Sequence, residues 1–322
     1  MAVVVRTDGL TKDFPVGFWR PHPKRALDAL NLEVPEGGVF GLLGPNGAGK
    51  STTLKLLLGL LRPTAGAAEV LGQPPGDLPA RQRLGFLPEN PTFYDHLTGE
   101  EVLTYFAGLF GYRGGDLRRR VRDSLSLVGL EADGRRPLRQ YSKGMIQRVG
   151  LAQALINDPD LVILDEPMSG LDPAGRREVR DLILQLRTSG RTVLFSSHIL
   201  SDAEQLCSRV GILARGRLVA AGTIDELTSH AGQGWEIVVT GLTSLVADRI
   251  ASRVKTLTMI ADGRYSIALA ADTRPEPLIA ELTAAGASLV SVTPLRTTLE
   301  DVFLQRTADA RQPQAAELRN AS

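Results

Sequence analysis

The sequence predicts an α/β domain built on a parallel sheet, followed by a smaller α+β domain. Short runs of apolar residues at 39–43, 161–164 and 192–195 are typical of strands that are buried on both faces of a sheet. A helical pattern at 174–189 connects two of these runs, as a parallel sheet requires. Beyond residue 235, the strand and helix patterns follow the order β-α-β-β-α-β, which is typical of a ferredoxin-like module.

The first strand leads into a glycine-rich turn, GPNGAGKST, and then into a helical pattern. The spacing G-x-x-x-x-G-K-S places backbone amides around phosphate oxygens, with Lys50 reaching the β- and γ-phosphates and Ser51 on magnesium. A chance glycine turn before a helix is the alternative, but the strand and the helix stand where the motif requires them. The predicted phosphate-binding residues are Gly44, Pro45, Asn46, Gly47, Ala48, Gly49, Lys50, Ser51 and Thr52.

The second half of such a site is expected at the end of another buried strand. Asp165 and Glu166 directly follow four aliphatic residues, and ligands bind at the carboxyl ends of the strands in open α/β sheets. We expect Asp165 to hold magnesium through water. Glu166 is placed to polarise an attacking water, because phosphoryl transfer depends on an oriented nucleophile and on charge stabilisation.

Further motifs in the same order make residues 7–222 similar to the ATP-binding subunits of ABC transporters. Residues 141–145, YSKGM, resemble the LSGGQ signature of that family: Ser142 and Gly144 match, whereas Lys143 and Met145 depart. The resemblance implies a P-loop ATPase domain with a helical subdomain, and ATP and Mg²⁺ as cofactors. It also implies that Ser142 and Gly144 cap the γ-phosphate of ATP held by a second subunit. The charge of Lys143 either approaches that phosphate or faces solvent.

Two other motifs carry the resemblance. Residues 169–173, SGLDP, resemble the D-loop, which runs between subunits in the family, so Asp172 is expected at the subunit interface. His198 follows the apolar strand at 192–197 and matches the switch histidine that contacts the γ-phosphate. Its position at a predicted strand end, after the acidic strand and a connecting helix, favours a functional role.

Two positions fit the family pattern less closely. Glu89 stands where the family's Q-loop has glutamine; its carboxylate can still ligate magnesium or water, although it adds negative charge beside the phosphates. Asn90 is the alternative at that place. Phe14 best matches the aromatic residue that stacks on adenine, while Phe18 and Trp19 lie close enough to compete.

Composition restricts the class of protein. The 37 basic and 36 acidic side chains nearly cancel, so no dedicated nucleic-acid binding is expected. We expect part of an arginine cluster in the helical subdomain to face a membrane partner or anionic headgroups. Its members are Arg118, Arg119, Arg120, Arg122, Arg135, Arg136 and Arg139.

No secretion signal and no apolar run long enough to span a bilayer are visible. A single cysteine, Cys207, allows no intrachain disulfide and suits a reducing compartment. We therefore expect a peripheral protein on the cytoplasmic side of the membrane, bound to a separate multispanning permease.

The predicted domains are an ATPase domain at 1–222, a linker at 223–234, a second domain at 235–307 and a disordered tail at 308–322. The second domain is expected to have strands at 235–240, 255–260, 264–270 and 288–293, helices at 244–253, 276–285 and 297–304, and a hairpin turn at Asp262-Gly263. It carries no metal or nucleophile pattern. A packing or dimerising module is favoured, and regulation by ligand sensing is the alternative.

Together these features predict a subunit that dimerises head to tail around two ATP molecules, hydrolyses them and drives a permease. Export is favoured, since the C-terminal extension and the Pro-Glu sequence at the Q-loop resemble those of drug- and antibiotic-exporter ATPases. The alternative is a soluble ABC-type mechanoenzyme that acts on ribosomes or nucleic acid. Its relatives usually carry two cassettes or long coiled coils, and neither is present in this sequence.

Overall fold

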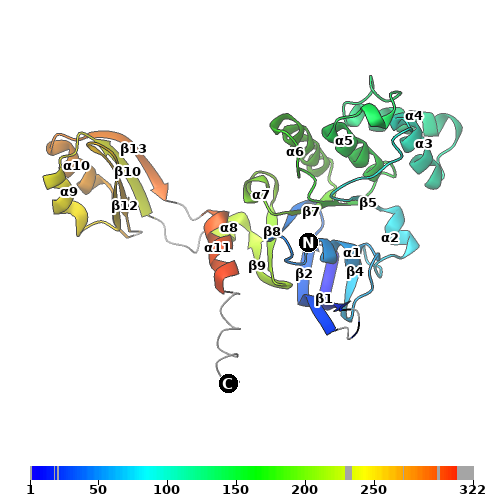
Figure 1. Cartoon of the computed structure of the whole chain (residues 1–322), viewed down its shortest axis with the longest axis horizontal. Helices are drawn as coiled ribbons and strands as arrows, with labels where there is room; N and C mark the ends of the chain where they lie inside the picture. Colours follow the sequence, from blue (N-terminus) through cyan, green and yellow to red (C-terminus); the bar gives the residue numbers. More distant parts are fainter. Residues whose placement is uncertain are drawn as a thin grey trace. The chain divides into compact units, whose positions relative to one another are not determined.

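The computed structural model describes residues 2–17, 19, 22–228, 234–270, 272–295 and 298–309, and the chain divides into two compact units (Figure 1). The first unit extends to Ile224, and the second extends from Asp225 to Gln305. The end of the last helix, α11 (Leu299–Asp309), from Arg306 onward, groups with the first unit.

The first unit is built on a six-stranded sheet with the order β5-β6-β7-β3-β8-β9. Its first five strands are parallel, and β9 pairs antiparallel with β8. The central strands β6 and β7 are buried along their whole length, because helices cover both faces of a parallel sheet. The strands are β3 (Gly38–Leu43), β5 (Leu84–Leu87), β6 (Leu161–Asp165), β7 (Thr192–Ser197), β8 (Arg209–Ala214) and β9 (Arg217–Thr223).

A second sheet of the first unit has the order β2-β1-β4 and is antiparallel. Leu27 and Leu30 of this sheet share one buried core with Leu54 of helix α1 and Leu161 of β6. This core fixes α1 and the turn before it between the two sheets. The elements are β1 (Val3–Val16), β2 (His22–Pro35), β4 (Ala65–Val70) and α1 (Lys50–Leu57).

A helical part of the first unit lies beside β5, where α3, α4 and α5 gather (Figure 1). Their buried faces share one core with Leu87 of β5 and Val179 of α6. Helix α3 begins with a reciprocal capping box, in which Thr98 Oγ1 accepts from the Glu101 amide and the Glu101 carboxylate accepts from the Thr98 amide. The helices of the first unit beyond α1 are α2 (Leu78–Gln82), α3 (Gly99–Leu109), α4 (Gly114–Leu127), α5 (Lys143–Ala154), α6 (Pro173–Thr188), α7 (Leu200–Leu206) and the 3₁₀ turn Leu138–Gln140.

The second unit is a four-stranded antiparallel sheet with the order β11-β12-β10-β13. This order is that of a ferredoxin-like module, as predicted, and Asp262-Gly263 connects β11 to β12. Ile237, Ile250 and Leu282 lie in its own apolar core. The elements are β10 (Gly234–Thr240), α9 (Ser244–Ala251), β11 (Thr256–Ala261), β12 (Arg264–Leu269), α10 (Glu276–Ala284) and β13 (Ser288–Leu295).

Two expected boundaries differ from the structure. Helix α8 (Ile224–Thr228) occupies the first part of the predicted linker. Helix α11 continues to Asp309, where a disordered tail from residue 308 was expected. Thr298 and Asp301 form a capping pair at its start. Residues 310–322 of the predicted tail lie outside the described residues. Among the described helices, none has the length and apolar character needed to cross a membrane.

Candidate functional site

The glycine-rich turn lies between the carboxyl end of β3 and the amino end of α1, as the sequence predicts. Gly49 stands just before α1 with φ +108°, and a β-carbon there would lie 2.6 Å from Leu27 Cδ2. Only glycine combines this backbone conformation with so close an approach. The turn therefore brings a series of backbone amides to the start of a helix, where the helix dipole favours an anion.

Lys50 is 5% exposed, and its ammonium points back over the turn. Its Nζ donates to the Gly44 carbonyl at 2.7 Å and lies 3.2 Å from Glu166 Oε1. A buried ammonium requires such partners, since an unpaired charge in the interior is costly. The contact joins the glycine-rich turn to the acidic strand end, which are more than a hundred residues apart in the sequence.

Ser51 and Asp165 lie side by side, with Ser51 Oγ donating to Asp165 Oδ1 at 3.2 Å. Ser196 of β7 donates to the same carboxylate oxygen at 2.6 Å. A hydroxyl and a carboxylate are the oxygen donors that Mg²⁺ prefers, and Mg²⁺ usually takes its other ligands from water and phosphate. These residues fit the magnesium ion that the sequence predicts.

Glu166 lies between a lysine and a histidine. His198 Nδ1 lies 2.8 Å from Glu166 Oε2, while Lys50 contacts the other carboxylate oxygen. Glu166 is 8% exposed and has φ +48°, an uncommon conformation for a residue with a side chain. Its amide donates to Ser196 Oγ at 2.9 Å, which helps to hold this strained position. Two side chains thus hold the carboxylate, and Ser196 holds the backbone that carries it.

A pocket of about 740 Å³ opens over these groups. Phe14 and Glu89 line it together with the glycine-rich turn, Glu166 and His198, so these sequence-predicted residues lie at one place. Lys24 and Arg25 also line it, and the sequence analysis did not identify them. They reach the pocket because β2 pairs with β1 in the register Phe14↔Lys24 and Asp13↔Arg25, and the sequence alone does not reveal this register.

The structure also shows where the alternative residues for adenine stacking and for the Q-loop position lie. Phe14 is partly buried, with Lys12 Nζ 5.2 Å from its ring centroid. Trp19 is 90% exposed and is not among the residues that line the pocket. Phe18 lies outside the described residues. At the Q-loop, Glu89 lines the pocket, whereas Asn90 does not.

Six predicted residues do not line this pocket within one chain. Gly44, Pro45 and Asp165 are still in contact with Lys50 or Ser51, which do line it. The other three are Ser142, Gly144 and Asp172. Ser142 and Asp172 cap helices instead: Ser142 Oγ accepts from the Met145 amide, and Asp172 Oδ1 accepts from the Gly175 amide. Gly144 lies in the first turn of α5. Lys143 is exposed, in line with the alternative that it faces solvent, and its ammonium also lies over Gly170 of the predicted D-loop, a contact that the sequence did not predict.

Two titratable groups near the site have shifted pKa values. Burial raises the pKa of Asp202 on α7, although Arg176, Arg180 and His198 act in the opposite direction. Its Oδ2 atom is buried without a hydrogen-bond partner among the described residues. Burial also raises the pKa of Cys207, whose sulfur packs 2.7 Å from the position of a β-carbon on Gly41 of β3. Cys207 is therefore an unreactive packing residue between α7 and the sheet.

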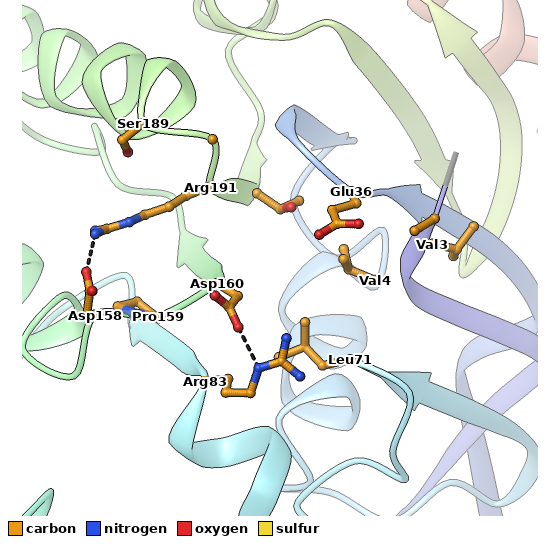
Figure 2. Close-up of a pocket in the computed structure, with 13 residues that line it drawn as sticks. Val3, Val4, Glu36, Leu71, Arg83, Asp158, Pro159, Asp160, Ser189 and Arg191 are labelled. Carbon is orange, nitrogen blue, oxygen red and sulfur yellow. Dashed lines mark hydrogen bonds and ion pairs between the residues drawn. The ribbon is translucent and has the colours of Figure 1, made fainter.

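A second pocket of about 400 Å³ lies at the opposite, amino-terminal ends of β6 and β7 (Figure 2). Its charged side chains pair with one another, Arg83 with Asp160 and Arg191 with Asp158. The described residues include no group of three or more histidine, cysteine or acidic side chains able to hold a metal. We assign no chemistry to this second pocket.

Comparison with known proteins agrees with the motifs. The family model of the ABC transporter matches residues 27–169. An uncharacterised ABC transporter ATP-binding protein of Synechocystis is 44% identical over 95% of this chain and 85% of its own length. The daunorubicin resistance ATP-binding protein DrrA3 of Streptomyces coeruleorubidus is 37% identical over 91% of this chain and 94% of its own length.

Among solved structures, a dimeric ATP-binding cassette in a post-hydrolysis state, bound to ADP and phosphate, has a TM-score of 0.61. It is 27% identical to this chain and covers 68% of it, with 98% of its own length matched. The fold class and the family predicted from the sequence are confirmed. The chain belongs to the ATP-binding proteins of the ABC transporter family.

Proposed function

We propose that this protein is the ATP-hydrolysing subunit of an ABC transporter and that it drives export through a separate membrane permease. The observation that carries the proposal is the convergence of Lys50, Glu166 and His198 at the mouth of the glycine-rich turn. Phosphoryl transfer needs positioning, charge stabilisation and an oriented water more than it needs covalent chemistry. These three side chains supply a cation, a carboxylate and an imidazole at one point.

Each side chain has a proposed role. Lys50 and the backbone amides of residues 46–52 bind the β- and γ-phosphates. Glu166 accepts a hydrogen bond from the attacking water and withdraws its proton, and His198 holds that carboxylate and contacts the γ-phosphate. Ser51 and Asp165 would hold magnesium, with Glu89 as a further oxygen ligand; the ion neutralises charge on the phosphates when it is bound. Phe14 offers its ring to the adenine.

The complete site is proposed to need two chains. Ser142, Gly144 and Asp172 do not line the pocket of their own chain, which supports a head-to-tail dimer in which they act on the ATP of the partner. The solved structure of the related cassette is dimeric. If ATP binds the closed dimer more tightly than the open one, that difference in affinity is the free energy available to move a permease, and hydrolysis then resets the dimer.

The helical part of the first unit offers a surface for the permease. A hollow of about 630 Å³ beside α3 is lined mostly by apolar and aromatic side chains, among them Phe93, Leu97 and Phe106. Tyr94 and Tyr105 line it while remaining 75% and 63% exposed. An apolar groove on this scale suits the apolar face of an amphipathic helix. We propose that a cytoplasmic helix of the permease binds here and keeps the protein at the cytoplasmic face of the membrane.

Some members of the arginine cluster have partners within the chain and others line an open hollow. This difference narrows the choice of arginines that could face a membrane partner. Arg119 pairs with Asp116 at 2.8 Å, and Arg120 donates to the Ile156 carbonyl at 2.6 Å while lying over the Tyr112 ring. These two arginines have structural partners. Arg135 also has a partner, since it pairs with Glu100 at 3.2 Å. Arg118 and Arg122 line a separate hollow of about 560 Å³ and are the arginines proposed to meet an anionic partner.

The direction of transport rests on the relatives. Three related ATP-binding proteins are named for daunorubicin resistance, fluoroquinolone export and Nod factor export. Two of them match more than nine-tenths of this chain, which includes the second unit. We therefore propose export of a compound that the permease selects.

The decisive experiment is purification of a Glu166→Gln variant from membranes in the presence of ATP and Mg²⁺, followed by mass spectrometry. The variant keeps the size of the side chain and removes the base, so it should trap the ATP-bound dimer together with a multispanning protein. Glu69→Gln, an exposed change on β4, is the matched control and should hydrolyse ATP like the wild type. Ribosomal or nucleic-acid partners without a membrane protein would favour the mechanoenzyme instead.

A further inference from the structure

Helix α5, which begins at the signature residues, is tied to the segment that follows Glu166 in the same chain. Gln147 is 2% exposed, and its Nε2 donates at 3.0 Å to the carbonyl of Pro167, the residue next to Glu166. One helical turn earlier, the Lys143 side chain lies over Gly170. A β-carbon on Gly170 would stand 3.3 Å from Lys143 Cε and would collide with Nζ.

The segment between Glu166 and Asp172 has little freedom to move independently of the helix. The Ser169 amide donates to the Glu166 carbonyl at 3.0 Å, and Gly170 has φ +66°. Asp172 then caps α6. A displacement of the first two turns of α5 should therefore move the backbone beside Glu166, because the Gln147 hydrogen bond and the Lys143 contact join the two directly.

We propose that Gln147 and Lys143 make the signature helix and the 167–171 segment move as one body, with Lys143 as a positioning residue for hydrolysis and not a phosphate ligand. This inference rests on the proposed function. The signature of one chain would meet the ATP of its partner, whereas Glu166 acts on the ATP of its own chain. The link between helix α5 and the 167–171 segment, called the tie below, would thus make the position of Glu166 in one ATP site depend on whether the other ATP site is occupied.

The structure distinguishes this role from the two alternatives for Lys143. A lysine that only faces solvent can be truncated without effect. A lysine that binds phosphate needs its charge, so its loss should raise the KM for ATP. A lysine that holds the segment by contact needs its stem, since both Cδ and Cε lie within 4 Å of the β-carbon position of Gly170. Methionine keeps a stem of similar length without the charge.

The first experiment compares ATP hydrolysis by the full-length Lys143→Ala and Lys143→Met variants. We expect Lys143→Ala to lower kcat at least about threefold with an unchanged KM, as expected when contacting residues act together. Lys143→Met should keep most of the wild-type kcat. Lys55→Ala, an exposed lysine on α1, is the matched control. A Lys143→Ala variant that equals this control, or a methionine variant with a raised KM, overturns the proposal.

The second experiment is a double-mutant cycle with Gly170→Ala. The added methyl group would stand 3.3 Å from Cε and collide with Nζ, so it should push the end of the flexible Lys143 side chain aside, stem included, and break the same contact. Because Gly170 has φ +66°, alanine also strains the backbone there, but this cost is common to both residues at position 143 and cancels in the cycle. Lys143→Ala should then lower kcat in the wild-type background and have no further effect in the Gly170→Ala background. Equal effects in both backgrounds would show that the two residues act independently and would overturn the proposal.

A third measurement does not depend on hydrolysis. Hydrogen exchange of the backbone amides at 166–172 should be at least about twofold faster in Lys143→Ala than in Lys55→Ala, because the segment loses a contact. If neither the wild type nor the Lys55→Ala control hydrolyses ATP, the proposed function fails, and faster exchange would still support the tie. Unchanged exchange would contradict the tie itself.

Discussion

At the scale of single residues, the site concentrates strain and charge on Glu166. A positive φ in a residue other than glycine costs about 1–3 kcal/mol and persists only where the surroundings enforce it. Here the Ser196 hydroxyl holds the Glu166 amide, while Lys50 and His198 hold its two carboxylate oxygens. The strained backbone places the carboxylate where both can reach it.

His198 is expected to matter for turnover more than for binding. A His198→Ala change removes the 2.8 Å contact with Glu166 but leaves the amides of the glycine-rich turn and Lys50 in place. We expect kcat to fall about 100-fold while ATP binding is retained, since a positioned acid or base contributes on this order. Steady-state hydrolysis and equilibrium binding of ATP check this. His96→Ala, a change at an exposed histidine, should leave both unchanged.

Asp202 is expected to make the stability of the folded protein depend on pH. Its pKa is raised in the folded protein by burial, so the folded state binds more protons than the unfolded state between the ordinary pKa and the raised one. Stability should therefore fall as the pH rises through this window. Asp202→Asn removes the penalty, and we expect its Tm to exceed that of the wild type at pH 7.5, with a smaller difference at pH 5.

Thermal unfolding of both proteins across this pH range is the measurement. Asp181→Asn is the control, because Asp181 is exposed on α6. A wild type that is more stable than Asp202→Asn at pH 7.5 would show that the attraction of Arg176 and Arg180 outweighs burial.

At the scale of the elements, the sequence predicts the strands of the central sheet well and the outer elements poorly. Strands β3, β6 and β7 are buried on both faces, so their aliphatic runs identify them. Long strands such as β1 and β2 carry mixed patterns interrupted by bulges, and the sequence analysis did not predict them. Since Lys24 and Arg25 depend on that pairing, their place in the pocket was missed as well.

Contacts between residues of different motifs could not be predicted from the sequence either. The glycine-rich turn and the acidic strand end can be recognised from the sequence, because each is a short motif whose residues are close together in the chain. The position of Lys143 depends on how α5 packs against the segment before α6, and that packing is set by buried residues such as Gln147. The predicted roles of the site residues remain predictions.

Helix α3 should depend on its capping box. A Thr98→Ala change removes the acceptor of the Glu101 amide and one partner of the Glu101 carboxylate. Loss of such a cap costs about 1 kcal/mol of stability, and urea unfolding should show a lower midpoint. Thr104→Ala, at an exposed position within the same helix, is the control and should not lower the midpoint, because alanine favours helix.

At the scale of the whole molecule, we expect the nucleotide chemistry to be separable from the second unit. The residues of the candidate site all lie before residue 200, in a unit with its own cores. The second unit has a separate apolar core around Ile237 and Leu282. Its ferredoxin-like topology follows from the element order, but its role does not, since many unrelated functions share that fold.

A chain that ends at Gly232 tests this separation. We expect it to bind ATP with a Kd within about threefold of the full-length value, because no pocket residue is removed. We expect weaker dimerisation or altered regulation, measured by analytical ultracentrifugation with ATP and by hydrolysis rates. Loss of ATP binding in a truncated protein that still unfolds cooperatively would contradict the separation.

The packing of Cys207 has a practical consequence for experiments that follow the protein with fluorescent labels. It is the only cysteine of the chain, and its thiol is half-buried against β3 with a raised pKa. The thiolate is the form of cysteine that attacks maleimide reagents, so this native sulfur should label slowly. A cysteine introduced at an exposed position can then carry a fluorophore without replacement of Cys207. The natural sequence thus provides a nearly silent background for distance measurements during the ATP cycle.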